Sequence, residues 1–121
     1  MSSMIAMTSD RFRITMDMPD VGEEYQRYFQ QMARRVRLNL VKDTLEVWFI
    51  HTKEGPSMEF IKWWSSQSTD IHIDEIFKDE VNRKLKCLNC TMDDHQLVYD
   101  YGSTEVMTHY IKWNFTQFKE L

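Results

Sequence analysis

The stretch Ser103–Phe118, which reads STEVMTHYIKWNFTQF, decides the fold class of this chain. Ile111, Trp113 and Phe115 occupy every second position, and polar residues stand between them. This period of two predicts a strand with one buried face. Most of the stretch consists of β-branched and aromatic residues, which favour strands. Because it is far longer than a usual strand of about five or six residues, we expect a long closing strand that needs partners along its whole length, from this chain or from another subunit.

Length and composition predict a single domain over residues 1–121, with residues 1–10 as a flexible N-terminal arm. Of the 121 residues, 42 % are hydrophobic and 13 % are aromatic, which favours a folded core over disorder. Lys and Arg number 15 against 19 Asp and Glu, a net charge of −4, and this gives little electrostatic footprint for a nucleic-acid binder. No apolar stretch approaches the roughly 20 residues of a membrane span, and no secretory signal is recognisable. We therefore expect no membrane anchor.

Three further segments of the first half show the alternation of strands. They are Arg11–Met18, Arg35–Val41 and Thr44–Thr52. The short link Lys42-Asp43 is either a hairpin turn or a bulge, and links this short imply antiparallel pairing. The third segment is apolar on both parities, so both of its faces are expected to be covered.

Two segments have helical spacing. Gly55-Pro56-Ser57 opens a helix over about 56–66, because proline suits the first helical turn. Its apolar side chains, Phe60, Ile61 and Trp64, form a stripe that predicts packing across a sheet. The segment Glu23–Arg34 fits either a helix or a strand; the helix is preferred because Glu residues lead it and Arg residues close it.

The second half reads as a series of strands. We expect a short strand within Asp70–Asp79, a strand over Val81–Leu88, a turn or loop at Met92–Gln96 and a short edge strand over Leu97–Tyr101, before the long closing strand. The predicted fold class is α+β and mainly β, an antiparallel β-sandwich or partial barrel with one flanking helix at about 56–66. The positions expected to build the core and the assembly are Phe12, Ile14, Leu45, Val47, Phe49, Phe60, Trp64, Ile111, Trp113 and Phe115.

The sequence contains no pattern of residues that predicts an enzyme. None of the common nucleotide-binding, hydrolase or metalloprotease motifs is present, and the four histidines are scattered. Asp93-Asp94-His95 is interpreted as a solvated turn, because adjacent turn residues point in different directions. We predict neither catalytic residues nor a cofactor.

Cys87 and Cys90 are the only cysteines and stand in a CxxC spacing. With His95 they could contribute to a metal site, and the same spacing occurs in redox motifs. A zinc site needs more ligands than lie close by, and a redox pair would open a helix. Two structural thiols are therefore the preferred interpretation.

The run Arg34-Arg35-Val36-Arg37 is the one local candidate for a nucleic-acid contact. The aromatic residues could supply stacking platforms for bases, yet no basic groove is evident around them. A solvated strand face, with Val36 turned inward, explains the run more simply.

Taken in order, these features resemble the tube proteins of contractile phage tails and related injection machines, including the type VI secretion tube. The resemblance rests on the strand DTLEVWFIHTKEG with Leu45, Val47 and Phe49, on the helix PSMEFIKWW, and on the step STEV before the closing aromatic strand. The chain departs from the family in lacking a proline after Asn89-Cys90 and in being shorter between its first two strands. A compact variant, or a relative that initiates or terminates the tube, would have this form.

The resemblance implies a structural protein whose copies form hexameric rings that stack into a tube. It implies a phage-tail subunit of the virion, assembled in the host cytoplasm, with sheath or baseplate proteins as partners. DNA would pass through the lumen without specific binding, which a mildly negative chain would favour. The alternative is a small α+β interaction or adaptor domain without catalytic activity.

Overall fold

The computed structural model describes residues 11–16, 23–53, 55–67, 69–100 and 106–121, and all that follows refers to these residues. No helix among them is long and apolar enough to cross a membrane. The predicted N-terminal arm, residues 1–10, lies outside the described residues. The elements are β1 (Arg11–Met16), α1 (Glu23–Gln31), β2 (Ala33–Asn39), β3 (Thr44–Ile50), α2 (Met58–Ser65), β4 (Thr69–Phe77), β5 (Glu80–Asp100), β6 (Val106–Asn114) and β7 (Gln117–Glu120).

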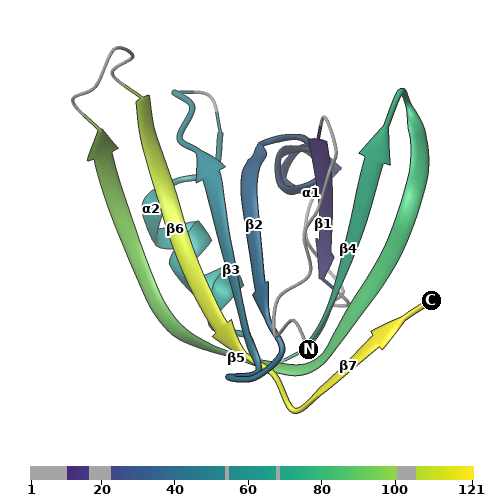
Figure 1. Ribbon diagram of the computed structural model, residues 1–121. Helices are drawn as coiled ribbons and strands as arrows, with labels where there is room; N and C mark the ends of the chain where they lie inside the picture. The colour runs from purple at the N-terminus through teal and green to yellow at the C-terminus, as the bar shows by residue number, and fades with distance from the viewer. Residues whose placement is uncertain (1–10, 17–22, 54, 68, 101–105) are drawn as a thin grey trace.

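All strands belong to one antiparallel sheet in the order β4-β1-β2-β3-β6-β5-β7, and β4 also pairs with β5. β5 makes this closure possible because its first half pairs with β4 and its second half pairs with β6. Figure 1 shows β5 passing beneath the other strands, so that its two halves stand on opposite sides of the sheet. The sheet is thus a partial barrel closed at one end. The predicted fold class, α+β and mainly β, is confirmed, and α1 adds a second helix.

β5 overturns the prediction of a turn or loop at Met92–Gln96. The predicted strands Val81–Leu88 and Leu97–Tyr101 are, over the described residues, parts of one strand. Asn89 takes a left-handed conformation with φ 54°, and the pairing register shifts there and again between Met92 and Asp94. Each shift exchanges the residues that face the core. The alternation therefore breaks twice, and short alternating pieces separated by polar residues look like strands joined by a loop.

The closing stretch also differs from the prediction of one long strand. β6 ends at Asn114, and β7 begins at Gln117 beside a different part of β5. At the bend, the Phe115 N–H donates to the carbonyl of Asp43 at 3.0 Å and the Thr116 N–H donates to that of Leu88 at 3.0 Å. The bend lets the chain pair twice with the curved β5. The part of the predicted strand before Val106 lies outside the described residues.

The remaining elements follow the predictions closely. β1 covers the described part of the segment Arg11–Met18, whose last two residues lie outside the described residues, and β2 begins and ends two residues before the predicted Arg35–Val41. The link between β2 and β3 is a hairpin turn, in which Asn39 Oδ1 accepts from the Val41 and Lys42 N–H groups at 3.0 and 3.1 Å. The ambiguous segment Glu23–Arg34 is a helix up to Gln31, after which β2 begins. On the outer face of β3, the side chains of Glu46, Trp48 and Ile50 are only half-buried. The expectation that both faces of this strand are covered is therefore wrong.

Aromatic side chains connect both helices to the buried face of the sheet. Ser57 caps α2, its hydroxyl accepting from the Phe60 N–H at 3.1 Å. Trp64 of α2 stacks on Phe29 of α1 with ring centroids 3.6 Å apart, and it meets Trp113 of β6 edge-on. The Trp113 indole N–H donates to the Ser65 carbonyl at 2.8 Å, which fixes α2 over β6.

Candidate functional site

Two strand edges are the candidate site, because the sheet leaves both without a partner strand among the described residues. The second half of β5, residues 91–100, pairs with β6 on one side only. β7 pairs only with residues 85–88 of β5, so its outer side is also free. We call these the β5 edge and the β7 edge. Unpaired N–H and C=O groups in such a row are a template for another strand.

The two edges stand at opposite ends of the strand order. Starting from the β5 edge, the sheet runs through β6, β3, β2, β1 and β4 to the first half of β5 and then to β7. In Figure 1 the β5 edge lies at the left border and β7 at the lower right. An edge that pairs with the other edge of a second copy would extend the sheet from subunit to subunit.

β7 is held firmly in place for so short a strand. The Leu121 N–H donates to the Lys84 carbonyl at 2.8 Å, beyond the last residue of the strand. Arg83 Nε lies 3.2 Å from Glu120 Oε1. Phe118 packs against the core. β7 is therefore a fixed part of the sheet.

The outer face of β2, β3 and β6, opposite the core, carries charges that are mostly paired. The Tyr110 hydroxyl donates to Glu46 Oε2 at 2.6 Å, and Arg37 Nε lies 3.8 Å from Glu46 Oε1. Lys112 Nζ lies 3.4 Å from Asp93 Oδ2. The Arg35 guanidinium lies over the Trp48 ring, 4.6 Å from its centroid. The exposed arginines fit the prediction of a solvated strand face.

Three histidines that are far apart in the sequence meet on the buried side. His109 Nε2 lies 2.9 Å from His51 Nδ1, and His109 Nδ1 lies 3.3 Å from His95 Nε2. His109 is fully buried, and desolvation together with the two neighbouring imidazoles lowers its pKa to about 4. Desolvation and Lys62 also lower the pKa of His95, whereas Asp94 acts to raise it. Asp93-Asp94-His95 lies within β5, so the prediction of a solvated turn there is wrong.

Both cysteines lie in the core beside the bend of β5, and both are free. The Cys90 thiol donates to the Cys87 carbonyl at 3.4 Å. Hydrogen bonding to Cys90 and burial raise the pKa of Cys87 well above its ordinary range, so its thiol stays protonated and is a poor nucleophile or ligand. His95 contacts His109 instead of the cysteines. In the described part of the chain, no group of three or more His, Cys, Asp or Glu residues could hold a metal ion.

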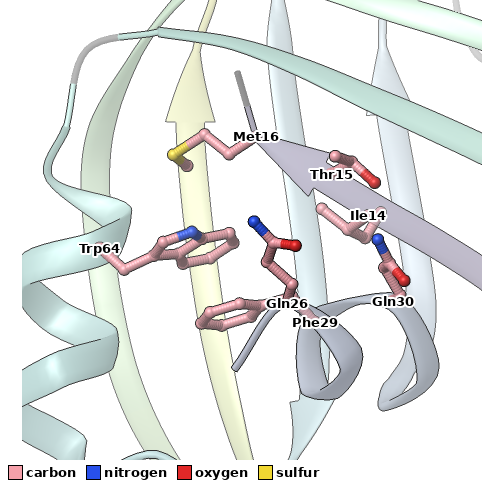
Figure 2. Close-up of a pocket in the computed structure, with 7 residues that line it drawn as sticks. All are labelled: Ile14, Thr15, Met16, Gln26, Phe29, Gln30 and Trp64. Atoms are coloured by element: carbon pink, nitrogen blue, oxygen red, sulfur yellow. The ribbon is translucent and has the colours of Figure 1, made fainter. Parts of the chain in front are cut away.

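A small cavity under β1 is lined mainly by apolar side chains and two glutamine amides. Its volume is about 20 Å³, room for about one water molecule. Figure 2 shows the amide of Gln26 beside the rings of Phe29 and Trp64, and the amide of Gln30 beside Ile14. The described residues that line it include no ionisable side chain. The lining residues are Ile14, Thr15, Met16, Gln26, Phe29, Gln30 and Trp64.

A larger open groove of about 610 Å³ lies between the end of α1 and the segment before α2. The Tyr28 hydroxyl, which borders it, donates to the Ile50 carbonyl at 2.5 Å, and burial raises its pKa well above the ordinary range. Gly55 lies against the Tyr28 ring, where a Cβ would come within 3.1 Å of the ring carbons. Among the described residues that line the groove, Arg27 is the one with a charged side chain.

The positions predicted for the core lie where a core role requires. Phe60 is half-buried and packs against the core, and the other nine are buried: Phe12, Ile14, Leu45, Val47, Phe49, Trp64, Ile111, Trp113 and Phe115. Their part in assembly stays a prediction. Sequence reasoning missed the two free edges, because β5 was divided into pieces. It also missed the histidine row, whose members are brought together only by strand register.

Known proteins resemble this chain in structure. No protein-family profile matches the sequence, and no curated protein matches it. The solved structure of Hcp1 from Flavobacterium johnsoniae aligns with a TM-score of 0.51 over 91 % of this chain and 80 % of that chain, at 12 % sequence identity. A likeness at this level of identity shows that the two chains share a fold.

Proposed function

We propose that the chain is a structural subunit that assembles into the tube of a contractile injection system. Hcp1, a type VI secretion tube protein, has the same fold. The sequence resemblance to tube proteins, which rests on residues 43–64 and on the closing stretch, points the same way. The role requires no catalytic group.

The observation that carries the proposal is the pair of free edges at opposite ends of one sheet. Pairing the β5 edge of one copy with the β7 edge of the next is a head-to-tail contact. Repeated contacts of this kind close into a ring when the rotation between copies divides a full turn, and they form an open filament otherwise. Closure also removes the exposed edges, which a soluble monomer must otherwise protect. Rings of six are what the family resemblance implies.

The more specific role is that of a phage tail tube, or of a protein that initiates or terminates one. The protein would then belong to the virion, assemble in the host cytoplasm and contact sheath or baseplate proteins. DNA would pass through the bore without specific binding. This role requires that the face lining the bore bind phosphates weakly. On the outer face, Arg37 and Lys112 pair with Glu46 and Asp93, which weakens their attraction for phosphates.

Imaging and mass measurement of the purified protein test the proposal. We expect rings or stacked rings in negative-stain electron micrographs, and a mass of several subunits by light scattering at high protein concentration. A protein that stays monomeric at every concentration would contradict the tube role. Capture of a specific partner by such a monomer would support the adaptor alternative.

A further inference from the structure

The histidine row links three strands at the open end of the sheet. His51 follows β3 directly, His109 lies in β6 and His95 lies in β5. Phe49 of β3 and Leu97 of β5 are the register partners of His109, so the three imidazoles cross the sheet nearly at one level. The ring centroids of His51 and His95 lie 5.0 and 5.5 Å from that of His109. The row therefore spans the half of the sheet that carries the β5 edge.

The two contacts are satisfied when the imidazoles are neutral. A neutral imidazole has one donor and one acceptor nitrogen, whereas an imidazolium has two donors. In a row of three neutral rings, each ring can donate to the next, and both contacts become hydrogen bonds. A single protonated ring can donate to its neutral neighbours, so the cost of the first proton comes from burying its charge. When a second, adjacent ring is also protonated, N–H faces N–H across 2.9 or 3.3 Å, and both rings carry positive charge. Such a contact is repulsive.

We propose that His51, His109 and His95 form an acid-sensitive lock, which holds β3, β6 and β5 together at neutral pH and loosens this end of the sheet when the pH falls. The lock acts within one subunit. It is independent of the proposed tube function.

The charged groups around the row favour its neutral state. From α2, Lys62 acts on His95 and opposes its protonation, and from β5 Asp94 acts in the other direction. His109 contacts its two histidine neighbours, and it is fully buried. Among the described residues, no carboxylate contributes to the pKa shift of His109, so none of them offsets a positive charge on the central ring.

The sign of the pH effect follows from the lowered pKa of His109. The unfolded chain binds a proton at His109 near the ordinary pKa of 6.5, and the folded chain binds it near 4. Stability is therefore fully present above pH 6.5 and decreases as the pH falls toward 4. From this residue alone, the equilibrium constant for unfolding should rise about thirtyfold between pH 8 and pH 5.

Urea unfolding followed by tryptophan fluorescence at pH 8, 6.5 and 5 tests the lock, with His109→Gln against the native chain. Gln keeps one donor and one acceptor but cannot be charged. We expect the variant to lose most of the thirtyfold change. The control His72→Gln replaces a half-buried histidine of β4 and should retain the change. Carboxylate protonation affects all three proteins alike, so the difference between them isolates the row.

A second measurement keeps the test decisive if His109→Gln does not fold. In the native chain, the imidazole proton resonances followed by NMR report the protonation of each histidine. We expect the His109 resonance to stay in its neutral position down to about pH 5. Titration of His109 near pH 6.5 would overturn the proposal. So would an unfolding constant that depends on pH equally in the native chain and in His109→Gln.

Discussion

At the scale of single residues, Asn89 marks the place where β5 bends. Its φ of 54° lies in the left-handed region, where most side chains are strained. Its N–H donates to Asp70 Oδ1 at 3.0 Å, and its amide donates to Thr116 Oγ1 at 3.1 Å. It thus ties together the bend of β5, the start of β4 and the bend before β7. Asparagine suits this position because it tolerates the left-handed region.

The first prediction concerns this conformation. Asn89→Val should lower the free energy of unfolding by about 2 kcal/mol or more, because a β-branched residue is strained at positive φ and the side-chain hydrogen bond is lost. Asn89→Gly loses the same hydrogen bond without strain, and we expect a loss of about 1 kcal/mol or less. Urea unfolding compares the two. Equal losses would mean that backbone strain at residue 89 is unimportant.

At the scale of elements, α2 is a short helix that depends on its ends and on its packing. It has 8 residues, and a helix this short is marginal in isolation. The Ser57 hydroxyl satisfies the Phe60 N–H at one end. Ile61 and Trp64 are buried in the core.

The second prediction tests the cap. Ser57→Ala should cost about 1 kcal/mol of stability, because the Phe60 N–H loses its acceptor at the helix N-terminus. Ser57→Asp should retain native stability, since the carboxylate accepts the same hydrogen bond and its charge suits this end of the helix. Thermal unfolding followed by circular dichroism measures both. A loss in Ser57→Asp as large as that in Ser57→Ala would show that the cap contributes little.

At the scale of the whole molecule, the free edges determine what the protein can build. Successive N–H groups along a strand point to opposite sides. The N–H of either Gln96 or Leu97 therefore faces β6, and the other faces the β5 edge. Their register partners, Tyr110 and His109, show that the pairing is regular there.

The third prediction uses this alternation. Gln96→Pro and Leu97→Pro each remove one backbone N–H, one on the β6 side of the strand and the other on its free side. We expect the substitution on the β6 side to destabilise the fold by about 3 kcal/mol, as proline does inside regular structure. The substitution on the free side should leave a folded protein that forms no rings. Circular dichroism and negative-stain microscopy separate the two outcomes. Normal rings from both folded variants would show that the β5 edge does not join subunits.

The sequence by itself determined the class of the fold. Alternation in Arg11–Met18, Arg35–Val41 and Thr44–Thr52, helical spacing in the segment that forms α2, and the density of aromatic residues were enough to predict a mainly β domain with a flanking helix. These signals are local, because each depends on side chains a few positions apart facing one side of one element.

Only the tertiary structure decided how β5 runs, where the sheet ends and which histidines meet. β5 changes the parity of its buried residues at two bulges, so its continuity depends on pairing with β4 and β6 and cannot be read from its own pattern. The closing stretch bends after Asn114 because its second partner lies on another part of the curved β5. His51, His95 and His109 become neighbours through strand register. Register is a relation between distant segments, whereas hydrophobic period is a property of one, and for that reason the period predicted the strands while the structure alone revealed their free edges and the buried row.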